Sequence, residues 1–180
     1  MSTLTITSYH NTPALSWRKT ALYLWSALFV AGNLALPQIC HAAAGADGGR
    51  ALLPLYFFTL VGAACFGRNA GLLIALASPL LNHAIFGMPP SGALPVILVK
   101  SCLIAVLAPV LLRRIALLPL AIAAIVLGYQ LLGGAFEWAW TGSLAAAQQD
   151  FVIGWPGMLA QFAAAWAILA FVATRREKSR

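Results

Sequence analysis

Polar side chains that could hold a small molecule interrupt the long apolar stretches of this chain. Asn33, Asn82, His83, Lys100 and Gln130 each lie among Leu, Ile, Val, Ala and Phe. Within apolar segments, ionisable groups are costly and commonly mark a ligand or transport site. Lys100 is the strongest of these signals, because a cation at such a position costs about 2.5–3.5 kcal/mol without a partner.

These groups are suited to binding, not to catalysis. Lys100 could meet a ligand carboxylate or phosphate, pair with Glu137, or extend toward lipid headgroups. His83 could contact a ligand or bond between helices, and the amide side chains could do either. No nucleophile is spaced with a base, and no Gly-rich phosphate loop or pair of carboxylates lies within the apolar stretches. We therefore predict a binding protein that is not an enzyme.

A more polar stretch, residues 135–155, contains three Trp residues and Glu137. Trp138, Trp140 and Trp155 could anchor helices at a membrane surface or stack on a ring-shaped ligand. We include Trp138 with the predicted binding residues. The complete predicted set is Asn33, Asn82, His83, Lys100, Gln130, Glu137 and Trp138.

No metal or cofactor site is predicted. Cys40, Cys65 and Cys102 show no spacing of the CxxC type, and no HExxH motif occurs. Three Cys residues in so apolar a chain are expected to be free thiols.

The composition indicates which class of protein carries these side chains. The chain is 62% hydrophobic and 8% charged, with mean hydropathy +0.88, whereas soluble domains are about 25% charged. The net charge of +7 comes from few, dispersed residues without a basic stripe, which argues against nucleic-acid binding. We predict an all-α integral membrane protein whose surroundings are the lipid bilayer.

Apolar runs divided by turn residues predict a bundle of six transmembrane helices. They form a single membrane domain over residues 16–174, preceded by a polar tail (1–15) and followed by a basic tail (175–180). The first run could instead be a signal peptide, since small residues follow it in HAAAGA. The expected helices are 20–37, 51–66, 69–86, 93–112, 115–132 and 156–173.

The distribution of Lys and Arg predicts the orientation. With both termini inside, the outer loops hold only Arg50, and Lys100 lies within a span. By the positive-inside rule the protein is therefore expected to be N-in and C-in, as a multi-pass protein. The residues then on the inner side are Arg18, Lys19, Arg68, Arg113, Arg114, Arg175, Arg176, Lys178 and Arg180.

Two short motifs complete the pattern. Ala27, Ala31 and Ala35 recur every four residues, so they line one helix face that another helix could approach closely. LLIALASPLLNHAIFGMPP ends the third run in a Gly-Met-Pro-Pro turn. With these motifs and its six short spans, the chain resembles the S components of energy-coupling-factor vitamin transporters, from about Lys19 to Thr174.

The resemblance implies a six-helix bundle in the bacterial cytoplasmic membrane that captures a vitamin or related micronutrient on its outer side. It also implies docking of Ala27, Ala31 and Ala35 on a transmembrane T component with bound ATPases. Cobalamin is favoured slightly, since Cys40, His41 or His83 could approach its cobalt; lipoate, pantothenate and thiamine precursors stay open.

Two other classes of protein fit the sequence. The chain could be an assembly subunit without a ligand, whose polar residues hold helices together. It could also be a small intramembrane enzyme that uses His83 with Cys102 or Glu137.

Overall fold

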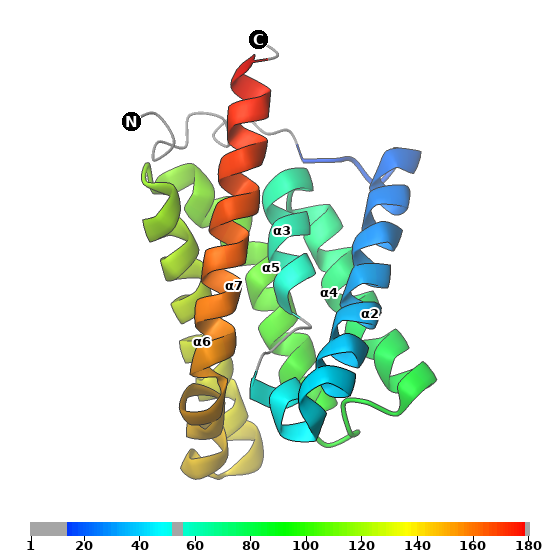
Figure 1. Ribbon diagram of the computed structural model, residues 1–180, viewed down its shortest axis with the longest axis vertical. Coiled ribbons are helices and arrows are strands. Elements are labelled where there is room, and N and C mark those ends of the chain that lie inside the picture. Colours follow the sequence, from blue (N-terminus) through cyan, green and yellow to red (C-terminus); the bar gives the residue numbers. More distant parts are fainter. Residues whose placement is uncertain (1–13, 52–55, 179–180) are drawn as a thin grey trace.

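The computed structural model describes residues 14–51 and 56–178, and within these ranges the chain is helical, without a β-strand. Figure 1 shows an upright bundle in which the first helix begins and the last helix ends at the same end. We call this the terminal end and the opposite one the distal end. The helices are α2 (Thr20–Ala51), α3 (Phe57–Phe66), α4 (Arg68–Phe86), α5 (Leu94–Arg114), α6 (Leu118–Thr141) and α7 (Leu144–Lys178).

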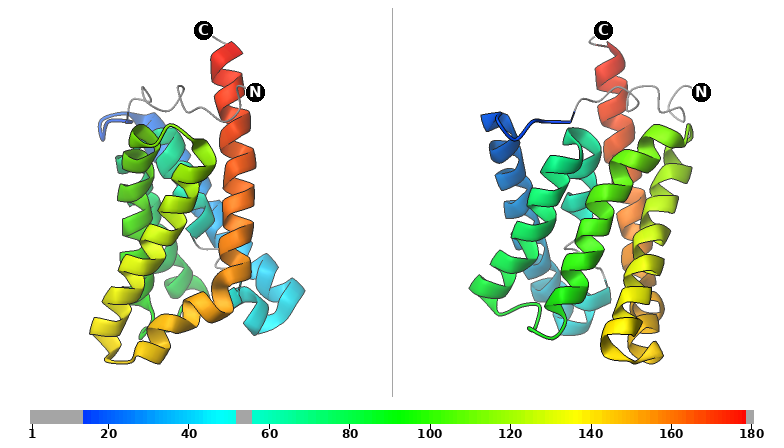
Figure 2. Two further views of the ribbon diagram at one scale, coloured as in Figure 1. Left: turned by 90° about the vertical axis from the view of Figure 1, so that its left-hand side faces the viewer. Right: turned by 180° about the vertical axis from the view of Figure 1, so that it is seen from behind.

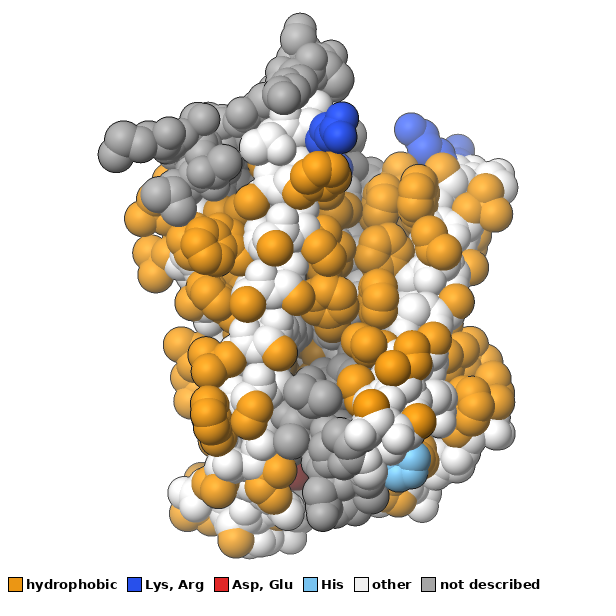
Figure 3. Space-filling view, in the orientation of Figure 1, with side chains coloured by type: hydrophobic (Ala, Val, Ile, Leu, Met, Phe, Trp, Pro, Cys, Tyr) orange, Lys and Arg blue, Asp and Glu red, His pale blue; other side chains and the backbone are white. Residues whose placement is uncertain are grey.

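The outside of the bundle is apolar. Leu24, Leu131 and Val152 are 68%, 62% and 73% exposed, and apolar side chains cover the flank seen in Figure 3. Five helices are long and apolar enough to cross a membrane, and α3 is a shorter apolar helix. Because lipid, not water, stabilises such a surface, these are the features of a multi-pass membrane protein. The predicted all-helical bundle is confirmed.

The short helix α3 is the centre of the bundle. All of residues 59–65 are buried, and α3 contacts α2, α4, α5 and α7. Small residues permit this packing: a Cβ on Gly71 would lie 2.7 Å from Cβ of Ala63 and 3.1 Å from Cα of Ala105. With 10 residues, α3 is about 15 Å long, half of a hydrocarbon layer of about 30 Å.

Hydrogen bonds fix α3 at the terminal end. The guanidinium of Arg176 donates to the carbonyl oxygen of Cys65 at 3.1 Å. The N–H of Leu15 donates to the carbonyl oxygen of Phe66, also at 3.1 Å. These bonds satisfy carbonyls that the last turn of a helix leaves unpaired. Residues 1–13 of the predicted polar tail lie outside the described residues, but Leu15 belongs to the packed structure.

Basic residues gather at the terminal end. They occur at the beginning of α2, between α3 and α4, and at the ends of α5 and α7. Lys and Arg side chains accordingly lie at the upper end of Figure 3. The grouping of cations predicted from the sequence is therefore present in the described part of the chain.

Two helices have bounds close to those predicted, since α4 (predicted 69–86) and α5 (predicted 93–112) differ by at most two residues. The predicted helix 51–66 is realised from Phe57 onward. Its first residue, Ala51, belongs instead to α2, and residues 52–55 lie outside the described ranges.

Three helices are longer than predicted. α2 continues past Pro37 and is interrupted only at Gly45, where φ is 70°; a proline removes one hydrogen bond, and this does not end a helix that its neighbours support. α6 passes through Gly133 and Gly134 to Thr141, and α7 begins at Leu144.

The predicted wet connection 135–155 is therefore helical, apart from a tight turn at Gly142 with φ 69°. Polar composition alone does not distinguish a loop from the exposed end of a helix. Figure 2 shows the first part of α7 running obliquely at the distal end before the helix turns upright. At its other end α7 continues to Lys178, so most of the predicted basic tail, 175–180, is helical.

Candidate binding site

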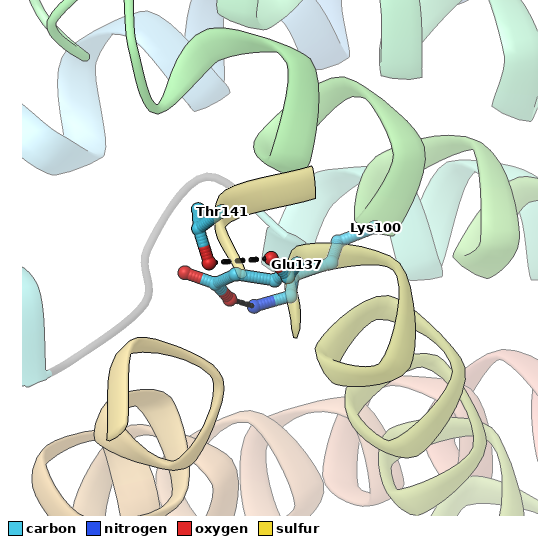
Figure 4. A network of polar contacts seen from close by, with 3 residues as sticks. All are labelled: Lys100, Glu137 and Thr141. Atoms are coloured by element: carbon cyan, nitrogen blue, oxygen red, sulfur yellow. Dashed lines mark hydrogen bonds and ion pairs between the residues drawn. The ribbon is translucent and has the colours of Figure 1, made fainter. Parts of the chain in front are cut away.

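A buried ion pair joins α5 and α6. Nζ of Lys100 lies 2.7 Å from Oε2 of Glu137 (Figure 4). The two partners differ in exposure: Lys100 is 1% exposed and Glu137 is 17% exposed. The cation is therefore inside the protein, whereas the carboxylate reaches the surface.

Gly133 makes room for the lysine. A Cβ at this position would overlap Cγ of Lys100 and lie 2.9 Å from its Cε. Gly133 and Glu137 are four residues apart, so they share one face of α6. The stem of Lys100 therefore packs on the glycine, and its ammonium group meets the carboxylate one turn later.

Glu137 lies in the last turn of α6. The hydroxyl of Thr141 donates to the carbonyl oxygen of Glu137 at 2.7 Å (Figure 4). Gly142 then ends the helix in the left-handed conformation, and its N–H donates to the carbonyl oxygen of Trp138 at 2.8 Å. These bonds fix the backbone beneath Glu137, and its side chain extends from the end of a helix.

Gln130 lies one turn before Gly133 on the same helix face. Its side chain is 1% exposed, and neither its amide nitrogen nor its amide oxygen has a hydrogen-bond partner among the described residues. Oγ of Ser101, next to Lys100 in α5, is also buried and without a partner there. An unsatisfied buried polar group costs about 1–3 kcal/mol. A polar ligand that formed hydrogen bonds with these atoms would recover that cost.

Tyr129 and Gln161 link α6 to α7. The tyrosine hydroxyl donates to Oε1 of Gln161 at 2.8 Å, and the Tyr129 ring contacts that of Tyr56 with centroids 5.2 Å apart. Nε2 of Gln161 has no partner among the described residues. Toward the terminal end the buried residues of this region are apolar; they include Ile104, Ala108, Leu118, Ile122 and Ile125.

A second polar group connects α2, α3 and α4. The amide nitrogen of Asn33 donates to the hydroxyls of Thr59 at 3.1 Å and Ser78 at 3.0 Å. Nε2 of Gln38 donates to Oδ1 of Asn82 at 3.4 Å. The structure thus gives Asn33 and Asn82 helix-to-helix hydrogen bonds, one of the two roles expected for amides.

His83 interacts with its own turn. Its Nδ1 lies 2.6 Å from the carbonyl oxygen of Pro89, so the imidazole supports the Gly-Met-Pro-Pro connection. Trp138 follows Glu137, but its side chain is 54% exposed, as an interface anchor would be. Ala27, Ala31 and Ala35 are all exposed along one face of α2.

Of the seven predicted site residues, Lys100, Gln130 and Glu137 lie together along the α5–α6 contact. Asn33 and Asn82 belong instead to the polar group that connects α2, α3 and α4. Thr59 and Ser78 were missed, because hydroxyl side chains in apolar helices commonly bond their own backbone. Gly133 was interpreted as a helix end, and only its position opposite Lys100 reveals its role.

The described residues contain no group of three His, Cys, Asp or Glu side chains that could hold a metal ion. Comparison of the chain with protein-family models, curated proteins and solved structures gave no match.

Gly133→Ala should destabilise the protein by about 1–3 kcal/mol, because the new methyl group overlaps the Lys100 stem and the rigid helix backbone cannot yield. Gly134→Ala is the matched control, since its Cβ would lie 3.6 Å from the nearest atom, the carbonyl oxygen of Ala147. Thermal unfolding of the purified proteins in detergent measures both. Equal melting temperatures for the two variants would contradict the packing described for Lys100.

Removing one member of the ion pair should cost more than removing both. Lys100→Met or Glu137→Gln alone leaves a charge without its counter-charge, at a cost of up to about 3–5 kcal/mol. The double variant K100M/E137Q should recover most of that loss, since no uncompensated charge remains. A double-mutant cycle of unfolding free energies measures the coupling, and additive losses would show that the two charges do not stabilise each other.

Proposed function

We propose that this protein binds a small anionic nutrient, a vitamin or a related micronutrient, at the outer side of the bacterial cytoplasmic membrane. In this role it serves uptake and catalyses no reaction. The observation that carries the proposal is the α5–α6 site: it contains a buried cation, and the Gln130 amide on the same face of α6 as Glu137 has no hydrogen-bond partner among the described residues. Intramembrane ionisable residues are functional by default, because their burial is costly.

The charge distribution supports the orientation. Basic residues at the terminal end are expected in the cytoplasm by the positive-inside rule. Both termini are then cytoplasmic, and the distal end faces outward. Lys100 lies roughly 9 Å along α5 from Leu94, at 1.5 Å per residue, so the site lies in the outer half of the bundle.

The apolar core supports a closed inner half. Between Gln130 and the terminal end, the buried core residues of α5 and α6 are apolar except for the hydroxyl of Tyr129; they are Ile104, Ala108, Leu112, Leu118, Ala121, Ile122, Ile125, Val126 and Tyr129. Such packing gives a polar solute no path across the membrane by itself. A protein with an outer site and a sealed inner half captures its ligand and needs a further component to release it inside.

Ala27, Ala31 and Ala35 are the proposed contact with that component. All three are exposed on α2, and small residues at this spacing let a second helix approach closely. This agrees with the S-component interpretation of the sequence, in which a transmembrane T component with bound ATPases docks on this helix. The protein then acts as the substrate-binding subunit of an energy-coupling-factor transporter.

The ligand is expected to carry a carboxylate or phosphate that meets Lys100. Among the candidates, lipoate and pantothenate offer a carboxylate directly, while cobalamin and thiamine precursors remain in the panel to be tested. Cobalamin was favoured slightly because His83 could approach its cobalt, but this imidazole bonds to Pro89 within its own turn.

The ion pair also favours a second function, that of an assembly subunit without a ligand. Glu137 already satisfies Lys100 electrostatically, so the pair could serve only to hold α5 against α6. The two functions differ in what a substitution of Lys100 does to small-molecule binding.

Capture of a nutrient should depend on Lys100. We expect mass spectrometry of the gently purified protein to detect one co-purifying vitamin, and the same compound to raise the melting temperature. Lys100→Met should abolish both signals. Lys19→Met, which removes an exposed lysine at the opposite end, should leave them unchanged. A full vitamin panel that neither binds nor stabilises the wild-type protein would favour the assembly subunit.

Docking should be separable from capture. Ala31→Trp places a large side chain on the exposed face of α2 and should abolish co-purification with the T component while ligand affinity stays within about twofold. Leu127→Trp is the control, because Leu127 is 49% exposed on α6, away from this face. Loss of ligand binding and docking together in Ala31→Trp would contradict the proposed division of roles.

A further inference from the structure

We propose that Glu137 is an internal counter-ion that the ligand's own carboxylate or phosphate displaces from Lys100. The lysine then exchanges one anion for another as the ligand enters. This inference rests on the proposed function, because it names the chemical group by which the ligand is held and the event that admits it.

The exposure of the two partners sets the order of events. Lys100 is 1% exposed and Glu137 is 17% exposed, so a solute reaches the carboxylate before the ammonium group. Lys100 is held in place, because its stem lies directly against Gly133. An anion that approaches Lys100 from the side of Glu137 must therefore displace this carboxylate.

Glu137 is the partner that can move. It projects from the last turn of α6, and Thr141 and Gly142 bind backbone carbonyls of that turn, not its carboxylate. On leaving Lys100, the carboxylate gains water at the distal surface, where a hydrated charge costs little. Burying the Lys100 charge without a counter-charge would cost several kcal/mol. Exchange for a second anion avoids this state, whereas a neutral molecule offers no replacement charge.

Gln130 indicates what else the ligand carries. It lies on the same α6 face as Gly133, one turn or about 5 Å further into the bundle. Its amide offers one donor group and one acceptor, both buried and without partners in the described structure. The inferred ligand is therefore an anion whose charged group is followed by a neutral hydrogen-bonding group, such as an amide or a hydroxyl.

Chemical rescue tests the exchange without knowledge of the natural ligand. Glu137→Ala removes a CH₂ and a carboxylate, which together are the atoms of acetate. The full-length variant is purified in detergent, and its melting temperature is measured with sodium acetate, sodium chloride or acetamide. We expect a saturable rise with acetate, and none with acetamide or with chloride at equal ionic strength. The double variant K100M/E137A should show no response to acetate.

An E137A melting temperature that responds equally to acetate and chloride would overturn the proposal, since the rise would then be a general salt effect and not the binding of a carboxylate at Lys100. If E137A does not fold, Glu137→Gln replaces it, because the amide keeps the volume of the side chain. E137Q should then gain more stability from acetate than the wild type does, and an equal response would again overturn the exchange.

Vitamin binding separates this inference from the proposed function. A carboxylate vitamin should bind E137Q roughly tenfold more tightly than wild type, since the competing charged hydrogen bond is lost. Equal affinity of E137Q and the wild type for the vitamin would contradict the exchange but not the proposed function. If acetate stabilises E137A but no vitamin binds, the exchange would be supported and the proposed capture of a vitamin would be contradicted.

Discussion

A lysine ammonium group inside an apolar helical bundle must have an anion beside it. At Lys100 this requirement explains why α6 continues through two glycines and presents Glu137 one turn later. It also explains Gly133, since any side chain there would occupy the volume of the lysine stem. The contact between α5 and α6 is thus organised by the cost of separating one charge from its partner.

The rest of the bundle divides into two halves by the same reasoning. Near the terminal end the small residues of α3 let four neighbouring helices pack closely, and this core is apolar apart from Thr59, whose hydroxyl bonds to Asn33. α3 is too short to extend through the distal half, where the buried polar side chains of Lys100 and Gln130 are found. Close packing therefore seals one half, and polar side chains give the other half its chemistry.

Much of this arrangement could be predicted from the sequence. Composition and apolar runs divided by turn residues predicted the helical bundle, and the rarity of a lysine in such a run identified Lys100. The partner of Lys100 could not be chosen among lipid, ligand and Glu137. Glu137 is 37 residues away, so the choice depends on the register between two helices. Gly133 and Gly134 predicted a helix end for a related reason: intrinsic propensity disfavours glycine in a helix, and only the opposing side chain shows why it is present.

In the proposed exchange, Glu137 competes with the ligand for Lys100, and this competition changes what determines the affinity for the ligand. The free energy of binding is then the difference between two ion pairs of Lys100, one with the ligand and one with Glu137, and neither pair is measured alone. Such a difference is smaller than either term, which lowers affinity but makes release possible. In the proposed function, a partner protein would open the site toward the cytoplasm, and the return of Glu137 to Lys100 would then keep a counter-charge beside the lysine as the ligand leaves. The proposed function requires both capture and release of a ligand, and the carboxylate of Glu137 at the end of α6 would take part in both steps.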